Sequence, residues 1–249
     1  MKIIISPAKK MNVDTDSFDC RGLPLFLERT HQLLDALRAM SREQLRTLWE
    51  CSEPLARLND ERIRRMDLRS SLTPAILAYE GIQYQYMAPG VFTCDELDYI
   101  QEHLRILSGF YGLLRPFDGV VPYRLEMQAK LAVGAAADLY AFWGDSLSCE
   151  LSKDTEVILN LASKEYSRSV APHLPAGVRF ITCIFGEEKN GRILEKATLC
   201  KMARGEMVRY LAEHHCQTPE QAKRFDRLGF RFSPEHSDEN NYVFCKKGR

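Results

Sequence analysis

Short apolar strand patterns that alternate with helix patterns constrain the fold of this 249-residue chain more than any other feature. The β-branched run at residues 2–6 predicts a buried first strand, and the runs 157–162 and 178–185 predict two more. Apolar residues recur at helical spacing elsewhere, most clearly in 24–66 and 197–212. Because strands and helices are interleaved, we expect an α/β or tightly mixed α+β protein with a central mixed sheet flanked by helices.

The chain is predicted to form a single domain over residues 1–249, because it shows no repeat, no low-complexity stretch and no linker. The segment 24–70 is expected to be a helical subregion of that domain. Ser41 is predicted to cap its second helix. Pro54 is expected to open the next helix, and Asn59 to cap a further short one.

The remaining elements are predicted from shorter patterns. Two more helices are expected, one over residues 95–104 with Thr93 as its N-cap and one over 139–151. Asn190-Gly191 predicts a hairpin turn before a short strand at 192–194. Further strands are predicted at 75–79, 228–232 and 242–245.

The charges of the chain balance, with 34 basic and 34 acidic side chains and a formal net charge of zero. This balance argues against general attraction to nucleic acid or to anionic membranes, although a local basic patch is compatible with it. No apolar run approaches the roughly 20 residues of a transmembrane helix, and the apolar part of the N-terminus is only Ile3 to Ile5. We therefore expect a cytoplasmic protein with no membrane partner.

The eight cysteines are widely and irregularly spaced and form no C-x-x-C pair. This spacing predicts free thiols in a reducing compartment rather than a zinc knuckle or a disulfide scaffold. His214, His215 and Cys216 are adjacent, but neighbouring residues of a helix point about 100° apart and rarely bind one ion together. The sequence has no P-loop, G-x-G-x-x-G, G-x-S-x-G or H-E-x-x-H motif, and we expect no metal and no cofactor.

The central stretch 107–145 has an unusual composition for a structural segment. It combines glycines and prolines with arginine, tyrosine and carboxylate side chains, so it is expected to form little regular structure. Polar groups on irregular backbone that a scaffold supports often carry function. Arg115 and Arg124 could grip a phosphate or carboxylate in two-point contacts, unless the acids nearby only hold these arginines in a structural network. The candidate catalytic groups of this stretch are Tyr123, Glu126 and Asp145.

Residues outside this stretch complete a predicted binding cleft. Lys9 follows the first strand, at the end of a sheet where α/β proteins tend to bind ligands. Asn160 lies in an apolar strand and needs a hydrogen-bond partner, either a ligand or a neighbouring loop. Lys201 and Arg204 share a helix face, as ligand contacts or as a solvated basic edge, and Gly205 beside them predicts close packing. The predicted cleft comprises Lys9, Arg115, Tyr123, Arg124, Glu126, Asp145, Asn160, Lys201 and Arg204.

Five motifs occur in order along the chain: ISPAK at 5–9, LSGFYGLLRPFDGVVPYRLEM at 107–127, DLYAFWGD at 138–145, NLASKEY at 160–166 and KMARG at 201–205. With these motifs the chain resembles the YaaA family of bacterial peroxide stress proteins. The resemblance implies a single-domain fold peculiar to the family, a positively charged cleft and a helix-hairpin-helix-like element at about 41–66. It also implies DNA binding and a part in limiting intracellular iron under hydrogen peroxide stress.

Two functions from different classes follow as hypotheses. The first is a DNA-binding stress protein that limits free iron and oxidative DNA damage and contacts DNA through a local basic patch. The second is an enzyme that acts on a small anionic or nucleotide-like substrate in the predicted cleft. A monomer is favoured in either case. The arginines expected to contact DNA are Arg57, Arg62, Arg64 and Arg65.

Overall fold

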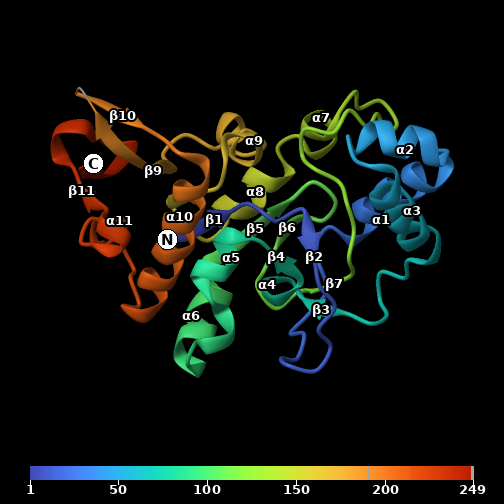
Figure 1. Cartoon of the computed structure of the whole chain (residues 1–249), viewed down its shortest axis with the longest axis horizontal. Helices are drawn as coiled ribbons and strands as arrows, with labels where there is room; N and C mark the ends of the chain where they lie inside the picture. Colours follow the sequence, from blue (N-terminus) through green and yellow to red (C-terminus); the bar gives the residue numbers. More distant parts are fainter. Residues whose placement is uncertain (190, 248–249) are drawn as a thin grey trace.

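A mixed β-sheet runs through the centre of the molecule, which we describe from a computed structural model of residues 1–189 and 191–247 (Figure 1). Its strands are β1 Lys2–Ile5, β5 Leu104–Ser108, β6 Gly112–Leu114, β8 Val157–Leu161, β9 Arg179–Lys189, β10 Arg192–Leu194, β11 Arg231–Phe232 and β12 Asn241–Lys247. They lie in the order β11-β12-β9-β8-β1-β5-β6, with β10 beside β9. Strands β5, β1, β8, β9 and β12 are parallel, and the other pairings are antiparallel. The predicted α/β class with a mixed sheet is therefore confirmed.

The order of the parallel strands creates a crevice beside β1. In chain order, β5 is the next strand of this sheet after β1, and it lies on one side of β1. Strands β8, β9 and β12 follow in turn on the other side. Ile5 pairs with Leu161, so β1 and β8 end at the same level. Open α/β sheets bind ligands where the strand order reverses, beyond the carboxyl ends of the strands. The residues that follow β1 and β8 occupy that position.

Helices surround the sheet. The α-helices are α1 Leu27–Ala39, α2 Arg42–Leu48, α3 Glu53–Arg65, α4 Ala75–Ala78, α5 Ile82–Met87, α6 Cys94–His103, α7 Leu139–Trp143, α8 Ser146–Ser152, α9 Lys164–Ser167, α10 Ala197–Glu213 and α11 Pro219–Ala222. The 3-10 helices are η1 Pro89–Val91, η2 Ala171–His173, η3 Arg227–Gly229 and η4 Pro234–His236. Two small antiparallel sheets pair β2 Lys10–Met11 with β4 Tyr79–Glu80, and β3 Thr73–Pro74 with β7 Gly119–Val120. Helices α1, α2 and α3 gather at one end of the molecule, and β9 to β12 lie at the other (Figure 1).

Helix α10 packs tightly against α5, and the two lie side by side in front of the sheet (Figure 1). Gly205 makes this contact possible, because a Cβ atom there would lie only 2.2 Å from the carbonyl oxygen of Gln83 and 2.9 Å from the amide of Met87. The prediction that Gly205 marks a close approach is confirmed. The contact holds the face of α10 that carries Lys201 and Arg204 close to the ends of β1 and β8.

The helical pattern of residues 24–66 is confirmed by α1, α2 and α3. Ser41 caps α2 in a capping box with Gln44, and Pro54 lies in the first turn of α3, both as predicted. The prediction for Asn59 is wrong: it lies inside α3, where its amide donates to the carbonyl of Leu55 at 2.8 Å. Helices α2 and α3 form a helix–loop–helix unit, and its helix-hairpin-helix character stays a prediction.

Three of the shorter element predictions are wrong in whole or in part. Residues 75–79 form α4 and the start of β4 rather than one strand, because a short apolar run does not distinguish a helix from a strand. The helix predicted over 139–151 is divided into α7 and α8 at Gly144, whose φ of 51° ends the first helix. Leu228 lies in η3, so the strand predicted from that residue is only β11.

The other strand and helix predictions agree with the structure. Thr93 caps α6 in a capping box with Glu96, and residues 242–245 lie within β12. Strands β9 and β10 pair antiparallel through Lys189 and Arg192, as a hairpin requires. Asn190 of the predicted turn lies outside the described residues.

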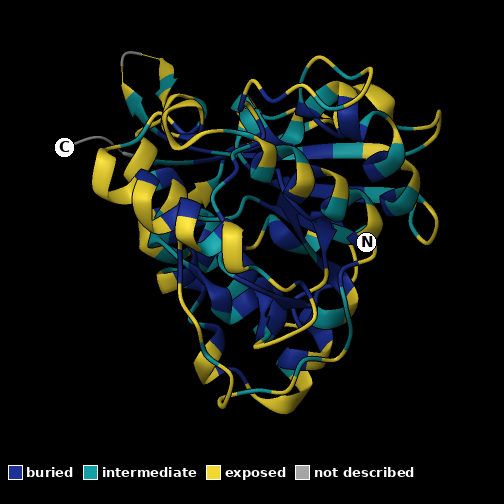
Figure 2. Cartoon of the chain, turned by 90° about the vertical axis from the view of Figure 1, so that its right-hand side faces the viewer, coloured by how far each residue is buried: buried dark blue, intermediate teal, exposed yellow. Residues whose placement is uncertain are grey.

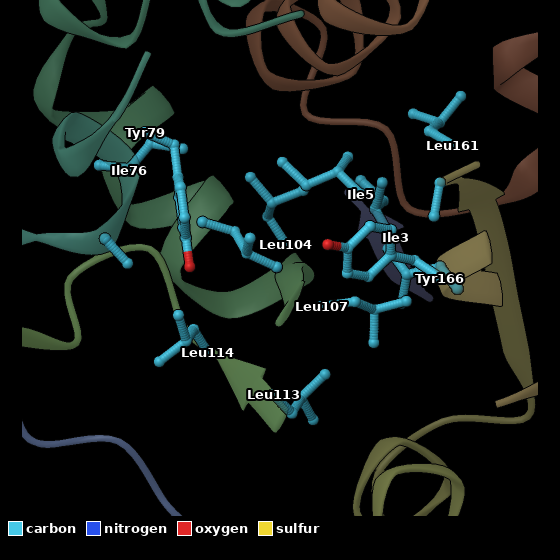
Figure 3. Close-up of a cluster of buried hydrophobic side chains, with 14 of the residues drawn as sticks. Ile3, Ile5, Ile76, Tyr79, Leu104, Leu107, Leu113, Leu114, Leu161 and Tyr166 are labelled. Carbon is cyan, nitrogen blue, oxygen red and sulfur yellow. The ribbon is translucent and has the colours of Figure 1, made fainter. Parts of the chain in front are cut away.

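A continuous hydrophobic core joins the sheet to the helices, and Figure 2 shows buried positions inside and exposed positions on outer helix faces and loops. Ile3 and Ile5 of β1 are fully buried, and Figure 3 shows them beside Leu107 and Tyr166. Leu37 of α1 belongs to the same cluster, so the core extends beneath the N-terminal helices. Within the described ranges, no helix is long and apolar enough to cross a membrane.

Candidate functional site

A cavity of about 450 Å³ lies where the strand order reverses, and we call it the switch-point cavity. Ser6 and Lys9 reach it from the end of β1, and Ser163 and Glu165 reach it from the end of β8. Helices α5 and α10 and the segment 123–126 supply the other walls. The two strand ends are tied together, because the Ser163 amide donates to the Ser6 hydroxyl at 2.8 Å.

The structure brings six of the nine predicted cleft residues together in this cavity. They are Lys9, Tyr123, Arg124, Glu126, Lys201 and Arg204. Lys9 follows β1, Tyr123, Arg124 and Glu126 belong to the central stretch, and Lys201 and Arg204 lie on α10.

The structure does not place the other three predicted cleft residues, Arg115, Asp145 and Asn160, in the wall of this cavity. Arg115 makes two contacts of 2.9 Å with the Asp118 carboxylate. Asp145 is the N-cap residue of α8. Asn160 is buried, and its side chain links the end of β8 to β9. It accepts from the Ala162 amide at 2.9 Å and donates to the Thr182 hydroxyl at 3.3 Å.

Glu126 is a carboxylate of the cavity wall that contacts two cations. Its two oxygens lie 2.7 Å from Lys9 Nζ and 3.4 Å from Arg124 Nη2. Gly109 lets the backbone of residues 125–127 pass closely, because a Cβ there would lie 2.6 Å from the Leu125 carbonyl oxygen. Glu126 is therefore fixed by its backbone support and by two cations.

Tyr123 contributes a neutral hydroxyl rather than a base. Its oxygen lies 2.6 Å from the Ser108 hydroxyl and 2.8 Å from the Tyr79 hydroxyl, in a buried chain of three groups. Burial raises the pKa of Tyr123 to about 12, so the phenol keeps its proton at physiological pH. This arrangement stiffens the wall beside Glu126.

Glu165 is a second carboxyl group of the cavity wall. Burial raises the pKa of the Glu165 carboxyl, and the nearby Glu126 adds to the effect, while Lys9 and the Gln128 amide oppose it. That amide donates to the carboxylate at 3.3 Å. Glu165 therefore holds its proton to a higher pH than an exposed glutamate does.

The cavity has more cationic than acidic side chains. Its cations are Lys9, Lys10, Arg124, Lys201 and Arg204, and its acids are Glu80, Glu126 and Glu165. Lys10 pairs with Glu80 at 2.6 Å, and Glu126 is shared by Lys9 and Arg124. The surplus therefore lies on α10, where Lys201 and Arg204 form no ion pair with any residue of 1–189 or 191–247.

Buried hydrogen-bond donors without partners cluster at this site. In the described part of the chain they include Nε of Arg204, Nε of Arg124 and the side-chain amide nitrogen of Gln83. All three residues line the switch-point cavity. Buried donors are nearly always paired, and an unpaired one costs about 1–3 kcal/mol. Because the unsatisfied groups are all donors, the group that would complete the site is a hydrogen-bond acceptor.

Three further residues of β4 and α5 line the cavity, although the sequence motifs do not indicate them. They are Glu80, Gln83 and Tyr84. Tyr84 donates to the Ser6 carbonyl at 3.0 Å, and a Cβ on Gly81 would lie 3.1 Å from that of Ala8. No local pattern marks this segment, since only the packing of α5 against α10 and the β1 end brings it to the site.

The arginines predicted to contact DNA lie on α3, which does not line the cavity. Arg57 pairs with Glu61 at 3.2 Å and Arg64 with Asp60 at 2.9 Å. Arg62 donates to the Asn59 side chain at 3.4 Å, and Arg65 is exposed with no partner in the described ranges. Those ranges also hold no group of three or more His, Cys, Asp and Glu side chains that could bind a metal ion.

Comparison with known proteins places the whole chain in one family. The family profile described as Peroxide stress protein YaaA matches residues 1–236. A UPF0246 protein of Desulfitobacterium hafniense is 54% identical over 246 residues, which cover 99% of this chain and 98% of that protein. UPF0246 proteins of Lachnoclostridium phytofermentans and Pediococcus pentosaceus are 53% and 52% identical over 246 residues, covering 99% of this chain and 96% and 98% of their own lengths. The resemblance carried by the five motifs is thus confirmed, and the chain belongs to the peroxide stress protein YaaA (UPF0246) family.

Proposed function

We propose that this peroxide stress family protein binds a small anion, a phosphate or carboxylate group, in the switch-point cavity. The observation that carries the proposal is Arg204, a half-buried guanidinium in the cavity wall with no partner in the described chain. Lys201 lies one helical turn away on the same face of α10. An anion between them would supply the acceptors that the unpaired donors lack.

The chemistry of the wall favours an oxyanion over an apolar ligand. Arginine binds carboxylate and phosphate in two-point hydrogen bonds, which are stronger than neutral ones. The neighbouring carboxylate Glu126 already has two cations, which offset its negative charge. The site is therefore suited to bind an anion, or an anionic substrate if the protein is an enzyme.

Calorimetric titration with inorganic phosphate tests the proposal on wild type and on Arg204→Met. Arg204→Met is expected to weaken phosphate binding about tenfold or more, because it removes charge-assisted hydrogen bonds. It is also expected to leave the melting temperature unchanged or higher, because it removes an unpaired buried donor. A purely structural arginine would show the reverse, with lower stability and unchanged binding.

Arg209→Met is the matched control on the same helix. Arg209 pairs with Glu213 at 2.8 Å and does not line the cavity. This variant is expected to bind phosphate as the wild type does. If phosphate does not bind to the wild type, or if both variants bind it equally well, the proposed anion site is wrong.

DNA binding that limits oxidative damage and free iron is the second candidate function, and one surface feature favours it. Leu55, Leu58, Arg62 and Arg65 recur at helical spacing on α3, and the two leucines are 42% and 44% exposed. Neither Arg62 nor Arg65 pairs with a carboxylate in the described ranges. This stripe could contact phosphates through its arginines, unlike Arg57 and Arg64, which are neutralised on their own helix.

A salt-dependent DNA-binding assay separates these two pairs of arginines. The double variant Arg62→Gln/Arg65→Gln is expected to weaken duplex binding and to lower the slope of log affinity against log salt by about two. Arg57→Gln is the control and is expected to have little effect. Binding that is absent, or insensitive to salt, would exclude this second function.

A further inference from the structure

A second cavity adjoins the switch-point cavity and has a different chemistry. Its volume is about 780 Å³, and its walls are α2 with the following residues 49–50, and residues 128–130. Lys9 and Glu126 line both cavities, so the two form adjoining compartments on either side of this ion pair. We call the second one the α2 compartment.

The charges of the α2 compartment are the opposite of those on α10. Three carboxylates line it, from Glu43, Glu50 and Glu126, against two cations, Lys9 and Lys130. A second phosphate would meet this carboxylate surplus and be repelled. A neutral group would not be repelled.

The other lining residues suit a neutral group that forms hydrogen bonds. Gln44 and Gln128 each offer both donors and acceptors, while Met40 and Leu48 supply apolar contact. The Trp49 ring is buried in the same wall, and its indole N–H has no acceptor in residues 1–189 and 191–247. Such walls match a nucleobase or a sugar, which carries acceptors and donors but no charge.

We infer that the ligand is a phosphate monoester of a neutral polar group, a nucleoside or a sugar, with the phosphate against α10 and the neutral half in the α2 compartment. This inference rests on the anion site proposed above and names the class of ligand that the site takes. The order of the two halves follows from the charges, which are in cationic surplus at one end and in acidic surplus at the other.

The ion pair between the compartments does not block such a ligand. The Lys9 side chain is 65% exposed and that of Glu126 is 18% exposed. A pair with one exposed partner contributes little to stability, so Lys9 can turn from Glu126 to a bound phosphate. Arg124, which also contacts Glu126 and donates to the Trp49 carbonyl at 3.4 Å, keeps the carboxylate in place.

Titrations with inorganic phosphate, pyrophosphate, ribose 5-phosphate, adenosine monophosphate and adenosine test the inference, with tryptophan emission as a second readout. The chain has two tryptophans, and Trp143 is fully buried with its indole donating to the Gly109 carbonyl. Emission changes that disappear in Trp49→Phe therefore report on the α2 compartment. Ribose 5-phosphate or adenosine monophosphate is expected to bind at least about tenfold more tightly than inorganic phosphate and to change Trp49 emission.

Thr47→Phe places a bulky ring in the α2 compartment and narrows it, without touching the anion site. Thr47 is exposed on α2 and lines the compartment, whereas Arg46 beside it is exposed and does not. Thr47→Phe is expected to abolish the tenfold higher affinity of the monoesters over inorganic phosphate and to leave the affinity for inorganic phosphate unchanged. Arg46→Phe is expected to bind the monoesters and inorganic phosphate as the wild type does. Melting temperatures of the two variants check that each is folded.

The outcomes separate this inference from the proposed function. If both monoesters bind no more tightly than inorganic phosphate, if the gain survives Thr47→Phe, or if pyrophosphate binds best, the inference is overturned and the anion site stands. If no phosphate compound binds, or if adenosine binds as tightly as its monophosphate, the proposed function itself fails, and the inference fails with it.

Discussion

Arg57 and Arg64 of α3 are paired with carboxylates, whereas Lys201 and Arg204 of α10 have no such partner in the described chain. On α3, Asp60 is buried and lies 2.9 Å from Arg64 and 3.0 Å from Arg42 of α2, and Arg57 has Glu61. On α10, Lys201 and Arg204 face the switch-point cavity with no carboxylate partner in the described chain. The overall balance of 34 basic and 34 acidic side chains conceals this local difference.

The difference separates arginines that hold the fold from those free to bind a ligand. Arg38 donates to the carbonyls of Ile63 and Met66 at 3.0 and 2.7 Å, and Arg64 donates to the carbonyl of Met40 at 2.6 Å. These carbonyls lie at helix ends, where basic side chains commonly satisfy them. Arg204 has no such structural partner in the described chain, which is why we assign it to the proposed anion site.

The largest expected effect comes from separating α10 from α5. Gly205→Ala places a Cβ atom 2.2 Å from the Gln83 carbonyl oxygen, which belongs to the backbone and cannot move cheaply. We expect the free energy of unfolding to fall by about 3 kcal/mol or more, as for overpacked sites. Urea denaturation measures this loss.

Gly90→Ala is the control for this change, because nothing lies within 4 Å of a Cβ at that position. It is expected to change the free energy of unfolding by less than about 0.5 kcal/mol. Equal effects of the two variants would mean that α5 and α10 do not pack as closely as described, and the support for the unpaired face of α10 would be lost.

An intermediate effect is expected on the paired side of the comparison. Asp60→Asn removes the charge that Arg42 and Arg64 share at a buried position, and it should lower the free energy of unfolding by about 1–3 kcal/mol. Glu61→Gln breaks only the exposed pair with Arg57 and should cost no more than about 0.5 kcal/mol. Phosphate binding should be unchanged in both variants. A loss of binding in Asp60→Asn would remove the distinction between the two helices.

The parts of the fold that could be predicted from the sequence are those that local patterns determine. The β-branched β1, the apolar β8 and the caps Ser41 and Thr93 each follow from neighbouring residues. The strand order does not, because it depends on which strands pair across long separations. The strand predicted at the position of α4, Ala75–Ala78, is wrong for a related reason, since a short apolar run takes its conformation from the surrounding packing.

The site shows the same limit. Lys9 lies in the cavity wall because a strand end fixes its position, and Lys201 and Arg204 lie there together because a helix fixes their spacing. Arg115 and Arg124 belong to one irregular stretch, yet Arg115 is engaged by Asp118 and only Arg124 lines the cavity. Irregular backbone has no period from which the direction of a side chain could be predicted.

The smallest expected effect concerns the charge of the cavity itself. Burial raises the pKa of Glu165 in the folded protein above its ordinary value of 4.5, so ionisation of this carboxyl destabilises the fold as the pH rises through the raised pKa. Glu165→Gln stays neutral and should have a slightly higher melting temperature than the wild type at pH 7. The difference should vanish below about pH 4.5, where Glu165 is protonated in both folded and unfolded states. Glu239→Gln removes one carboxylate at an exposed position and is the matched control. If Glu165→Gln instead lowers the melting temperature at pH 7, the ionised carboxylate stabilises the cavity, and the cationic surplus on α10 is smaller than the unpaired side chains indicate.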